Sequence, residues 1–216
     1  MKKRHYVIFF DFDNTITTYD ILDDIIKRFS KDDAWVSLER KWVAGHIGSR
    51  ECLDGQIRRV QVSKKDLGKY LSKIKVDPAF KKILRLCDAK KIKKYILSDD
   101  FDFVLKTVLK ANGIQGLSVH CNKLVFSGDR LIPKFPFLNT ACHKCAHCKK
   151  GNLISKIGKA AITIYVGDGL SDICPAECAD IVFAKGTLAK YFRKKALAHI
   201  PFKKLSEVYD HLKSRF

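Results

Sequence analysis

Two aspartates separated by one residue follow a run of strand-forming residues near the start of the chain, at residues 9–17 (FFDFDNTIT). The preceding residues 5–10 (HYVIFF) are continuously apolar, as is typical of a strand buried on both faces of a parallel sheet. Side chains two residues apart on a strand point the same way, so Asp11 and Asp13 can reach one chemical group. Capping a following helix requires one acid and not two, which indicates that this pair has a chemical function.

Strand-like and helix-like segments alternate through the rest of the chain. We expect strands at residues 92–97, 161–166 and 180–184, and a strand or a hairpin with an Asn-Lys turn at 117–128. Residues 18–76 differ, because they show helical spacing with charged faces and almost no strand signal. The sequence therefore predicts an α/β parallel sheet with helices on both faces and one helical insertion after the first strand.

Polar residues follow three of the predicted strands. Asp11 and Asp13 follow the first, Ser98-Asp99-Asp100 follow the strand at 92–97, and Asp168 follows the strand at 161–166. Ligands of such sheets bind at the carboxyl ends of the strands, so these side chains should lie together. Clustered carboxylates are costly to bury without a counter-ion, and Mg²⁺ takes oxygen ligands. The sequence predicts a magnesium site there.

Length, composition and charge restrict the function further. The chain has 216 residues, 46% of them hydrophobic, which is ample for a packed core, and no apolar run approaches the roughly 20 residues of a membrane span. The apolar part of the basic N-terminus is short and runs into Asp11, so we expect a cytoplasmic protein and no signal peptide. The net charge of +19 favours anionic partners, but the lysines are spread along the whole chain, as on an ordinary solvated surface.

Three motifs at these strand ends resemble those of the haloacid dehalogenase superfamily of phosphohydrolases. Asp11-Phe12-Asp13-Asn14-Thr15 resembles its DxDxT signature, Ser98 its second motif, and Gly167-Asp168-Gly169-x-x-Asp172 its acidic fourth motif. The helical block resembles a C1-type cap. The resemblance covers essentially the whole chain, and it implies a Rossmann-like core of residues 1–16 and 78–216 with a cap of residues 17–77.

Within the superfamily the chain is most similar to subfamily IB, the phosphoserine-phosphatase-like branch. Residues 98–102 (SDDFD) resemble that branch's S-G-G-F-D, with two acids in place of two glycines, and residues 150–154 (KGNLI) resemble its lysine motif. Residues 148–151 (CKKG) and 167–175 also resemble two subgroups, the 2-hydroxy-3-keto-5-methylthiopentenyl-1-phosphate phosphatases and the phosphoethanolamine/phosphocholine phosphatases. The resemblance leaves the choice between them open.

The resemblance implies a Mg²⁺-dependent phosphatase that acts on a small phosphorylated metabolite. Asp11 is then the nucleophile that forms an aspartyl-phosphate, and Asp13 is the general acid and base. Ser98 donates to a phosphoryl oxygen, and Lys150 neutralises charge, with Lys149 as the alternative if the register differs by one residue. The implied magnesium ligands are Asp11, the backbone carbonyl of Asp13, Asp168 and Asp172, the last as a ligand or as an outer hydrogen-bond acceptor.

The same resemblance suggests substrate-binding residues. Asp20 is placed to bind an amino group and Arg58 a carboxylate or phosphate, with the adjacent Arg59 as an alternative to Arg58. Asp99 stands next to the predicted phosphate position, where its charge repels phosphate unless a lysine or a metal offsets it. Each charge in the cap also has a plain interpretation as part of a solvated helix surface.

Three cysteines and two histidines lie within residues 142–148 (CHKCAHC). C-x-x-C spacing can hold a tetrahedral metal, so a structural Zn²⁺ bound by Cys142, Cys145, Cys148 and His147 is one prediction. His143 or Cys121 could replace His147 as the fourth ligand. Reduced thiols and a redox-active pair are the alternatives, since the second C-x-x-C of a zinc ribbon is absent.

Two other functions fit parts of the sequence. A phosphomutase would use the same two aspartates, and product analysis distinguishes it from a phosphatase. A basic nucleic-acid-binding protein with this fold would draw on the net charge and the Cys/His cluster, but the acidic site is complete while no nucleic-acid motif is recognised. For the assembly, the expectation is a monomer or a homodimer.

Overall fold

A single twisted sheet forms the centre of the protein. The computed structural model describes residues 5–139, 142, 144–157 and 161–216. Its seven-stranded sheet has the order β4-β3-β2-β1-β5-β6-β7, parallel except for β4. The strands are β1 (His5–Phe10), β2 (Lys93–Phe101), β3 (Ser118–Ser127), β4 (Arg130–Lys134), β5 (Ala161–Gly167), β6 (Ile181–Ala184) and β7 (Ile200–Pro201). The predicted α/β class with a parallel sheet is confirmed.

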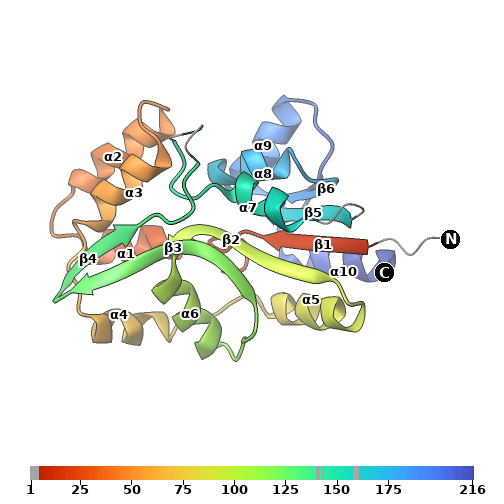
Figure 1. Cartoon of the computed structure of the whole chain (residues 1–216), viewed down its shortest axis with the longest axis horizontal. Helices are drawn as coiled ribbons and strands as arrows, with labels where there is room; N and C mark the ends of the chain where they lie inside the picture. The colour runs from red at the N-terminus through yellow and green to blue at the C-terminus, as the bar shows by residue number, and fades with distance from the viewer. Residues whose placement is uncertain (1–4, 140–141, 143, 158–160) are drawn as a thin grey trace.

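Helices cover both faces of this sheet (Figure 1). One face carries α5 (Pro78–Ala89), α6 (Asp102–Ala111) and α10 (Leu205–Arg215). The other carries α7 (Lys149–Lys156), α8 (Ile173–Ala176) and α9 (Gly186–Lys194), with a short 3₁₀ turn η1 (Leu170–Asp172) before α8. The result is a three-layer arrangement in which the carboxyl ends of the parallel strands stay open for a site.

The alternation of side chains along β1 explains why both faces are covered. Val7 and Phe9 belong to the hydrophobic cluster under α7, α8 and α9, whereas Ile8 and Phe10 belong to the cluster under α5, α6 and α10. Phe10 packs edge to face against Phe80 of α5, with ring centroids 5.4 Å apart. A strand that supplies two cores must be apolar at every position, which is the pattern of residues 5–10.

The segment 117–128 contains no Asn-Lys turn, so that option of the prediction was wrong. Asn122 and Lys123 lie inside one long strand, β3, and the chain turns at Gly128, whose φ of +59° suits glycine. The Asn122 side chain donates to the carbonyl oxygen of Asp99 at 2.7 Å. Asn122 is therefore used to hold the end of β2 and not to form a turn.

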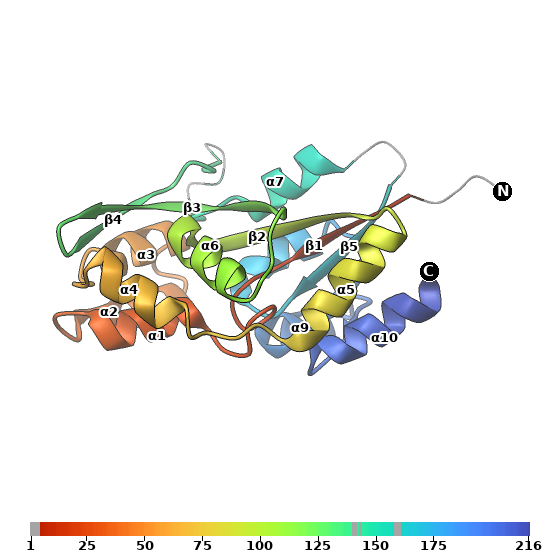
Figure 2. The same cartoon turned by 90° about the horizontal axis from the view of Figure 1, so that it is seen from below.

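The helical insertion sits at one end of the molecule, over the open end of the sheet (Figures 1 and 2). It contains α1 (Ile21–Phe29), α2 (Ala34–Val43), α3 (Ser49–Ile57) and α4 (Lys64–Leu71). Its two connections run together, because Thr17 pairs with Val76 and the Asp77 amide donates to the Ile16 carbonyl at 2.9 Å. The division into a core and a cap at residues 17–77 stays a prediction, since one continuous hydrophobic cluster joins the two parts.

Candidate active site

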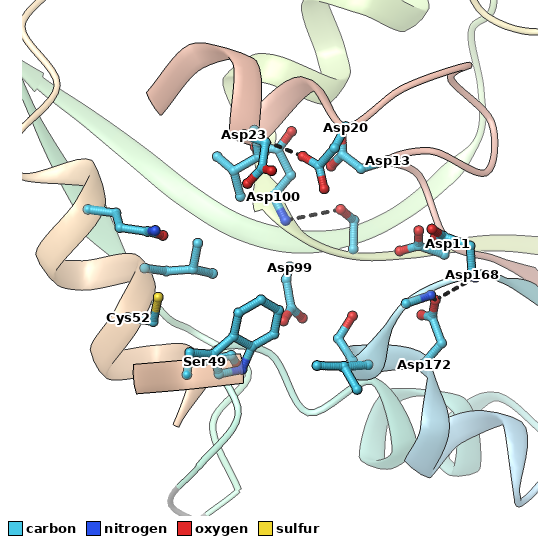
Figure 3. A pocket seen from close by; sticks show the side chains of 18 of the residues that line it. Asp11, Asp13, Asp20, Asp23, Ser49, Cys52, Asp99, Asp100, Asp168 and Asp172 are labelled. Carbon is cyan, nitrogen blue, oxygen red and sulfur yellow. Dashed lines mark hydrogen bonds between the residues drawn. The ribbon is translucent and has the colours of Figure 1, made fainter. Parts of the chain in front are cut away.

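A cavity lies between the strand ends and the helical insertion (Figure 3). Its floor comes from the residues that follow β1 and β5 and from Ser98, Asp99 and Asp100, which the structure places in the last part of β2 and not after it, and its roof comes from α1, α2 and α3. Asp11, Asp13, Ser98, Asp99, Asp168 and Asp172 all line it, so the structure brings the predicted strand-end residues together. The cavity measures about 130 Å³. That size is small beside drug-binding pockets and suits a small metabolite.

Asp11 is paired with a buried lysine. The backbone amide of Asp11 donates to the Val166 carbonyl at 2.9 Å, which extends the β1–β5 pairing and fixes the residue. One carboxylate oxygen, Oδ1, accepts from Lys149 Nζ at 2.6 Å, and Asp11 is only 6% exposed. Burial and the nearby Asp172 raise the pKa of Asp11, while Lys149 opposes this effect. The Lys149 ammonium therefore compensates the negative charge of Asp11, the predicted nucleophile.

The structure places Lys149, and not Lys150, at this position. Lys149 is 2% exposed, and its ammonium donates to Asp11, Asp172 and Ser171. Burial alone disfavours an ammonium, yet Asp11 and Asp172 raise the pKa of Lys149 well above its usual value. Lys150 is exposed on the next position of α7. Successive helix residues point about 100° apart, so only one of two neighbours can face the site.

Asp172 is held by four hydrogen bonds and is fully buried. Its Oδ1 accepts from Lys149 Nζ at 2.8 Å and from the Tyr165 hydroxyl at 2.7 Å. Its Oδ2 accepts from the amides of Asp168 and Gly169, both at 2.9 Å. With its lone pairs occupied in this way, Asp172 fits the second predicted role, an acceptor that orients Lys149, better than that of a magnesium ligand. Tyr165 was not predicted, because a tyrosine inside a strand looks like ordinary core.

Asp168 is oriented by the loop that follows β1. Asn14 Nδ2 donates to Asp168 Oδ2 at 2.6 Å and Thr15 Oγ1 donates to Oδ1 at 3.2 Å. Asn14 has a φ of +49°, which asparagine tolerates better than most residues. Asn14 and Thr15 therefore orient the Asp168 carboxylate in addition to forming the turn after β1.

The donor set at the strand ends fits a magnesium ion. Among the described residues, the one group of three metal-binding side chains whose ligand atoms lie within 4.8 Å of one another is Asp11, Asp168 and Asp172. All three offer carboxylate oxygens, the hard ligands that Mg²⁺ prefers. Because Asp172 is saturated, Asp11 and Asp168 remain as the side chains best able to bind the ion.

Asp13 lies beside the first turn of the insertion. Its Oδ1 accepts from the backbone amide of Ile21 at 2.9 Å, which ties it to the start of α1. Burial, and then the negative charges of Asp100, Asp20 and Asp11, raise the pKa of Asp13 well above its ordinary value. A raised pKa favours the protonated form of the carboxyl, which is the form that a general acid requires.

Ser98 is fixed by its neighbours at the end of β2. Its Oγ accepts from the Asp100 amide at 3.0 Å, and its carbonyl oxygen accepts from His147 Nδ1 at 2.7 Å. The second ring nitrogen of His147 accepts from Asn152 Nδ2 at 2.8 Å. Burial lowers the pKa of His147 to about 4, so the ring is neutral. Both of its nitrogens are in use, so the geometry does not support the prediction of His147 as a zinc ligand.

In the part of the chain that the structure describes, only two thiols of the cysteine cluster lie close together, whereas a tetrahedral metal site needs four converging ligands. Cys142 Sγ and Cys145 Sγ lie 3.8 Å apart, whereas Cys148 Sγ accepts from the Gly151 amide at 3.3 Å and caps α7. Cys121 is buried in the hydrophobic core, and His143 lies outside the described residues. Across the described ranges no three thiols or imidazoles converge. The geometry therefore does not support the zinc prediction.

The two cap arginines point away from the cavity. Arg58 forms a bidentate pair with Asp54, at 2.7 and 3.1 Å, on the exposed side of α3. Arg59 pairs with Asp32 at 2.9 Å. Neither lines the cavity, although Asp20 does. Sequence reasoning chose these arginines by resemblance to a motif. It missed the other cap residues that line the cavity, which are Leu22, Asp23, Ile26, Glu39, Trp42, Ser49, Cys52, Leu53 and Gln56.

Comparisons with known proteins identify relatives that are named as phosphatases. The Putative Phosphatase family matches residues 6–189. A 2-hydroxy-3-keto-5-methylthiopentenyl-1-phosphate phosphatase from Geobacillus thermodenitrificans is 28% identical over 214 residues, covering 97% of this chain and 96% of the relative. The bifunctional enzyme MtnB/MtnX of Bacillus licheniformis is 27% identical over 204 residues, covering 92% of this chain but only 47% of that longer protein.

Solved structures of phosphoserine phosphatases have the same fold. A substrate-bound complex superposes with a TM-score of 0.74 at 18% identity, covering 97% of this chain and 99% of the other. A phospho-aspartyl intermediate analogue gives a TM-score of 0.73 at 17% identity, with the same coverage. The expected superfamily and branch are confirmed. The chain belongs to the Putative Phosphatase family and has the haloacid dehalogenase fold of the phosphoserine phosphatases.

Proposed function

We propose that this protein is a Mg²⁺-dependent phosphatase that hydrolyses a small phosphomonoester through an aspartyl-phosphate on Asp11. The observation that carries the proposal is the buried network of Asp11, Lys149 and Asp172 beside Asp168 at the ends of β1 and β5. A lysine paired with two carboxylates inside a cavity is a group prepared to balance the charge of a phosphoryl group.

In the first step an oxygen of Asp11 attacks phosphorus, the bond to the ester oxygen breaks, and Asp13 gives its proton to the leaving alcohol. In the second step Asp13 takes a proton from water, which attacks the phosphorus of the aspartyl-phosphate and releases inorganic phosphate. Lys149 offsets negative charge throughout, since its ammonium reaches Asp11 at 2.6 Å. The hydroxyl of Ser98, buried at the end of β2, is placed to donate to a phosphoryl oxygen.

Asp11 and Asp168, with the backbone carbonyl of Asp13, would hold the Mg²⁺. When bound, the ion neutralises phosphate charge and orients the ester for in-line attack. Asn14 and Thr15 fix Asp168 for this purpose by their hydrogen bonds to its two oxygens.

The named relatives favour hydrolysis over the two other functions considered. The relatives that match along nearly their whole length are named as phosphatases, not as mutases or nucleic-acid-binding proteins. The substrate in the names of these relatives is a methylthiopentenyl phosphate. For this chain we propose only the broader class, a small phosphomonoester.

The test is release of inorganic phosphate from p-nitrophenyl phosphate and a panel of phosphorylated metabolites. We expect turnover with Mg²⁺, none with EDTA, and recovery when Mg²⁺ is restored. Product analysis tells free phosphate from a phosphoryl group moved within the substrate. A folded protein that moves the group without releasing phosphate would be a mutase and would contradict the proposal.

None of the helices among the described residues is long and apolar enough to cross a membrane. All eight cysteines are free thiols, which agrees with our proposal of a reducing compartment such as the cytoplasm. The assembly as a monomer or homodimer stays a prediction.

A further inference from the structure

Two thiols lie side by side on the loop that precedes α7. Cys142 Sγ and Cys145 Sγ are 3.8 Å apart, at C-x-x-C spacing. The sulfur atoms of a disulfide are about 2 Å apart, so an approach of about 1.8 Å would join these two. By contrast, Cys52, Cys87 and Cys121 are each buried. The pair on the loop is therefore placed for a reaction that the buried thiols are shielded from.

The two thiols differ as an attacking and a resolving thiol should. Cys142 is exposed, and hydrogen bonding to its sulfur from the Lys144 backbone amide lowers the pKa of Cys142. Cys145 is half-buried, and burial, followed by the nearby charge of Cys142, raises the pKa of Cys145 to about 12. The thiolate is the nucleophile in disulfide exchange. Cys142 is therefore the thiol that meets a disulfide from solvent, and Cys145 is the one that reacts second.

The same loop holds the cap against the core. The Lys144 carbonyl accepts from the Arg50 amide at 3.2 Å, and the Ala146 amide donates to Ser49 Oγ at 2.9 Å. Both cap partners belong to the first turn of α3, and Ser49 lines the cavity. Cys145 stands between the two anchoring residues of the loop. A movement of Cys145 therefore acts directly on the contact that positions one wall of the cavity.

This contact is closely packed. A Cβ atom at Gly48, which immediately precedes α3, would lie only 2.3 Å from the Lys144 carbonyl oxygen. The loop consequently has no free space on the side that faces α3. Close-packed groups transmit a displacement to their neighbours and do not absorb it. Joining the two sulfur atoms should therefore displace the start of α3 or break its hydrogen bonds to the loop.

We propose that Cys142 and Cys145 form a redox-active dithiol, which small disulfides of the glutathione class oxidise to an intramolecular disulfide. The new bond disturbs the contact between the loop and α3, and catalysis in the cavity slows. This consequence rests on the proposed phosphatase function, whereas the dithiol itself does not. In a reducing compartment a disulfide of this kind is transient, because cellular thiols reduce it again.

The reaction takes two exchange steps. In the first, the Cys142 thiolate attacks one sulfur of the small disulfide, whose sulfur–sulfur bond breaks, and the departing thiolate takes a proton from solvent. In the second, Cys145 gives its proton to solvent and attacks the Cys142 sulfur of the mixed disulfide, which releases the other small thiolate to be protonated in turn. The protein loses two electrons and two protons, and the two small thiols carry them.

Tryptic mapping tests the dithiol, because trypsin cleaves after Lys144, between the two cysteines. The whole protein is equilibrated with oxidised glutathione, its free thiols are alkylated, and the digest is analysed by mass spectrometry. We expect peptides 135–144 and 145–149 to be linked, and dithiothreitol to separate them. Cys148→Ser changes the other cysteine of the second peptide and should retain the link. Cys145→Ser should instead accumulate the mixed disulfide of Cys142 with glutathione.

The rate of alkylation gives a second readout on the reduced protein. Cys142 should react at least about tenfold faster than Cys174, which is also exposed but whose pKa is raised by burial and by Glu177. Peptides that stay unlinked in excess oxidised glutathione would overturn the proposal. A link that persists in Cys145→Ser would overturn it too, as would one tightly bound zinc ion per chain that blocks the oxidation.

Turnover of p-nitrophenyl phosphate with Mg²⁺ tests the effect on the cavity. We expect the oxidised protein to be about tenfold slower, since displacements of about 1 Å near a site have effects of this order or larger, and dithiothreitol should restore the rate. Cys142→Ser, treated identically, should keep its rate. A linked protein with an unchanged rate would overturn the effect on catalysis. A protein with no turnover in either redox state would contradict the proposed function, while linked peptides would still establish the dithiol.

Discussion

The two ends of the cavity are built in opposite ways. At the strand ends Asp172 accepts four hydrogen bonds, Asp168 accepts two from side chains, and Lys149 bridges Asp11 and Asp172. Toward the cap, one carboxylate oxygen of Asp99 and one of Asp100 are buried with no hydrogen bond from the described residues. The contrast indicates that the catalytic groups are preorganised by the protein, whereas the end of the cavity that would select the substrate is less fully hydrogen-bonded.

Catalysis at the strand-end region of the cavity should be lost when its nucleophile is replaced. Asp11→Asn keeps the shape of the side chain but cannot form an aspartyl-phosphate that hydrolyses normally. We expect kcat for p-nitrophenyl phosphate to fall at least about a thousandfold. Release of phosphate measures the rate, and a circular dichroism melt checks the fold. A folded variant that retains a tenth of the wild-type rate would mean that another residue attacks.

The adjacent residues Lys149 and Lys150 allow the effect of the buried network on stability and catalysis to be compared with that of a surface charge. Lys149→Met leaves Asp11 and Asp172 without their shared cation, so we expect a loss of about 3–5 kcal/mol in the free energy of unfolding. A fall of about a hundredfold or more in kcat/KM should accompany it. Urea melts and steady-state kinetics measure the two effects. Lys150→Met is the control, and both values should stay near those of wild type because that side chain is exposed.

His147 should make the network sensitive to acid. Its pKa is lowered to about 4 in the native state, while in the unfolded chain it titrates near 6.5. The unfolded chain therefore binds the proton first as the pH falls, and stability is lost between pH 6.5 and pH 4 by about 3 kcal/mol. In His147→Gln that loss should be absent. Urea melts of both proteins across this range measure it, and parallel pH profiles would contradict a buried neutral ring.

Asp99 should show the opposite pH dependence at the selecting end. Burial raises its pKa to about 6, although Lys149 opposes the shift, so the native state retains the proton that the unfolded chain loses near 3.8. The contribution of the neutral Asp99 carboxyl to the free energy of unfolding therefore falls as the pH rises from about 4 to 6. Asp99→Asn should therefore stabilise the metal-free protein by about 1–3 kcal/mol at pH 7.5, and by almost nothing at pH 4. Urea melts in EDTA test this, and an equal gain at both pH values would point to packing instead.

The catalytic end could be predicted from the sequence, whereas the selecting end could not. The convergence of Asp11, Ser98 and Asp168 follows from parallel strands, whose carboxyl ends meet at one edge. Asp23, Glu39 and Trp42 lie on three-turn helices with charged residues on several sides, and nothing in that pattern says which side faces a cavity. Arg58 shows the same limit, since its pairing with Asp54 depends on the rotation of α3.

The sequence by itself therefore determined the sheet, the strand-end acids and the helical insertion, because strand periodicity and buried apolar runs act over short distances. Only the tertiary structure decided between Lys149 and Lys150, since the rotation of α7 depends on Cys148 at its start and on the position of Asp11, 138 residues earlier in the chain. It also showed that His147 supports the Ser98 carbonyl, because both of its ring nitrogens have partners brought near by folding. Such choices rest on contacts between distant residues, which local pattern does not encode.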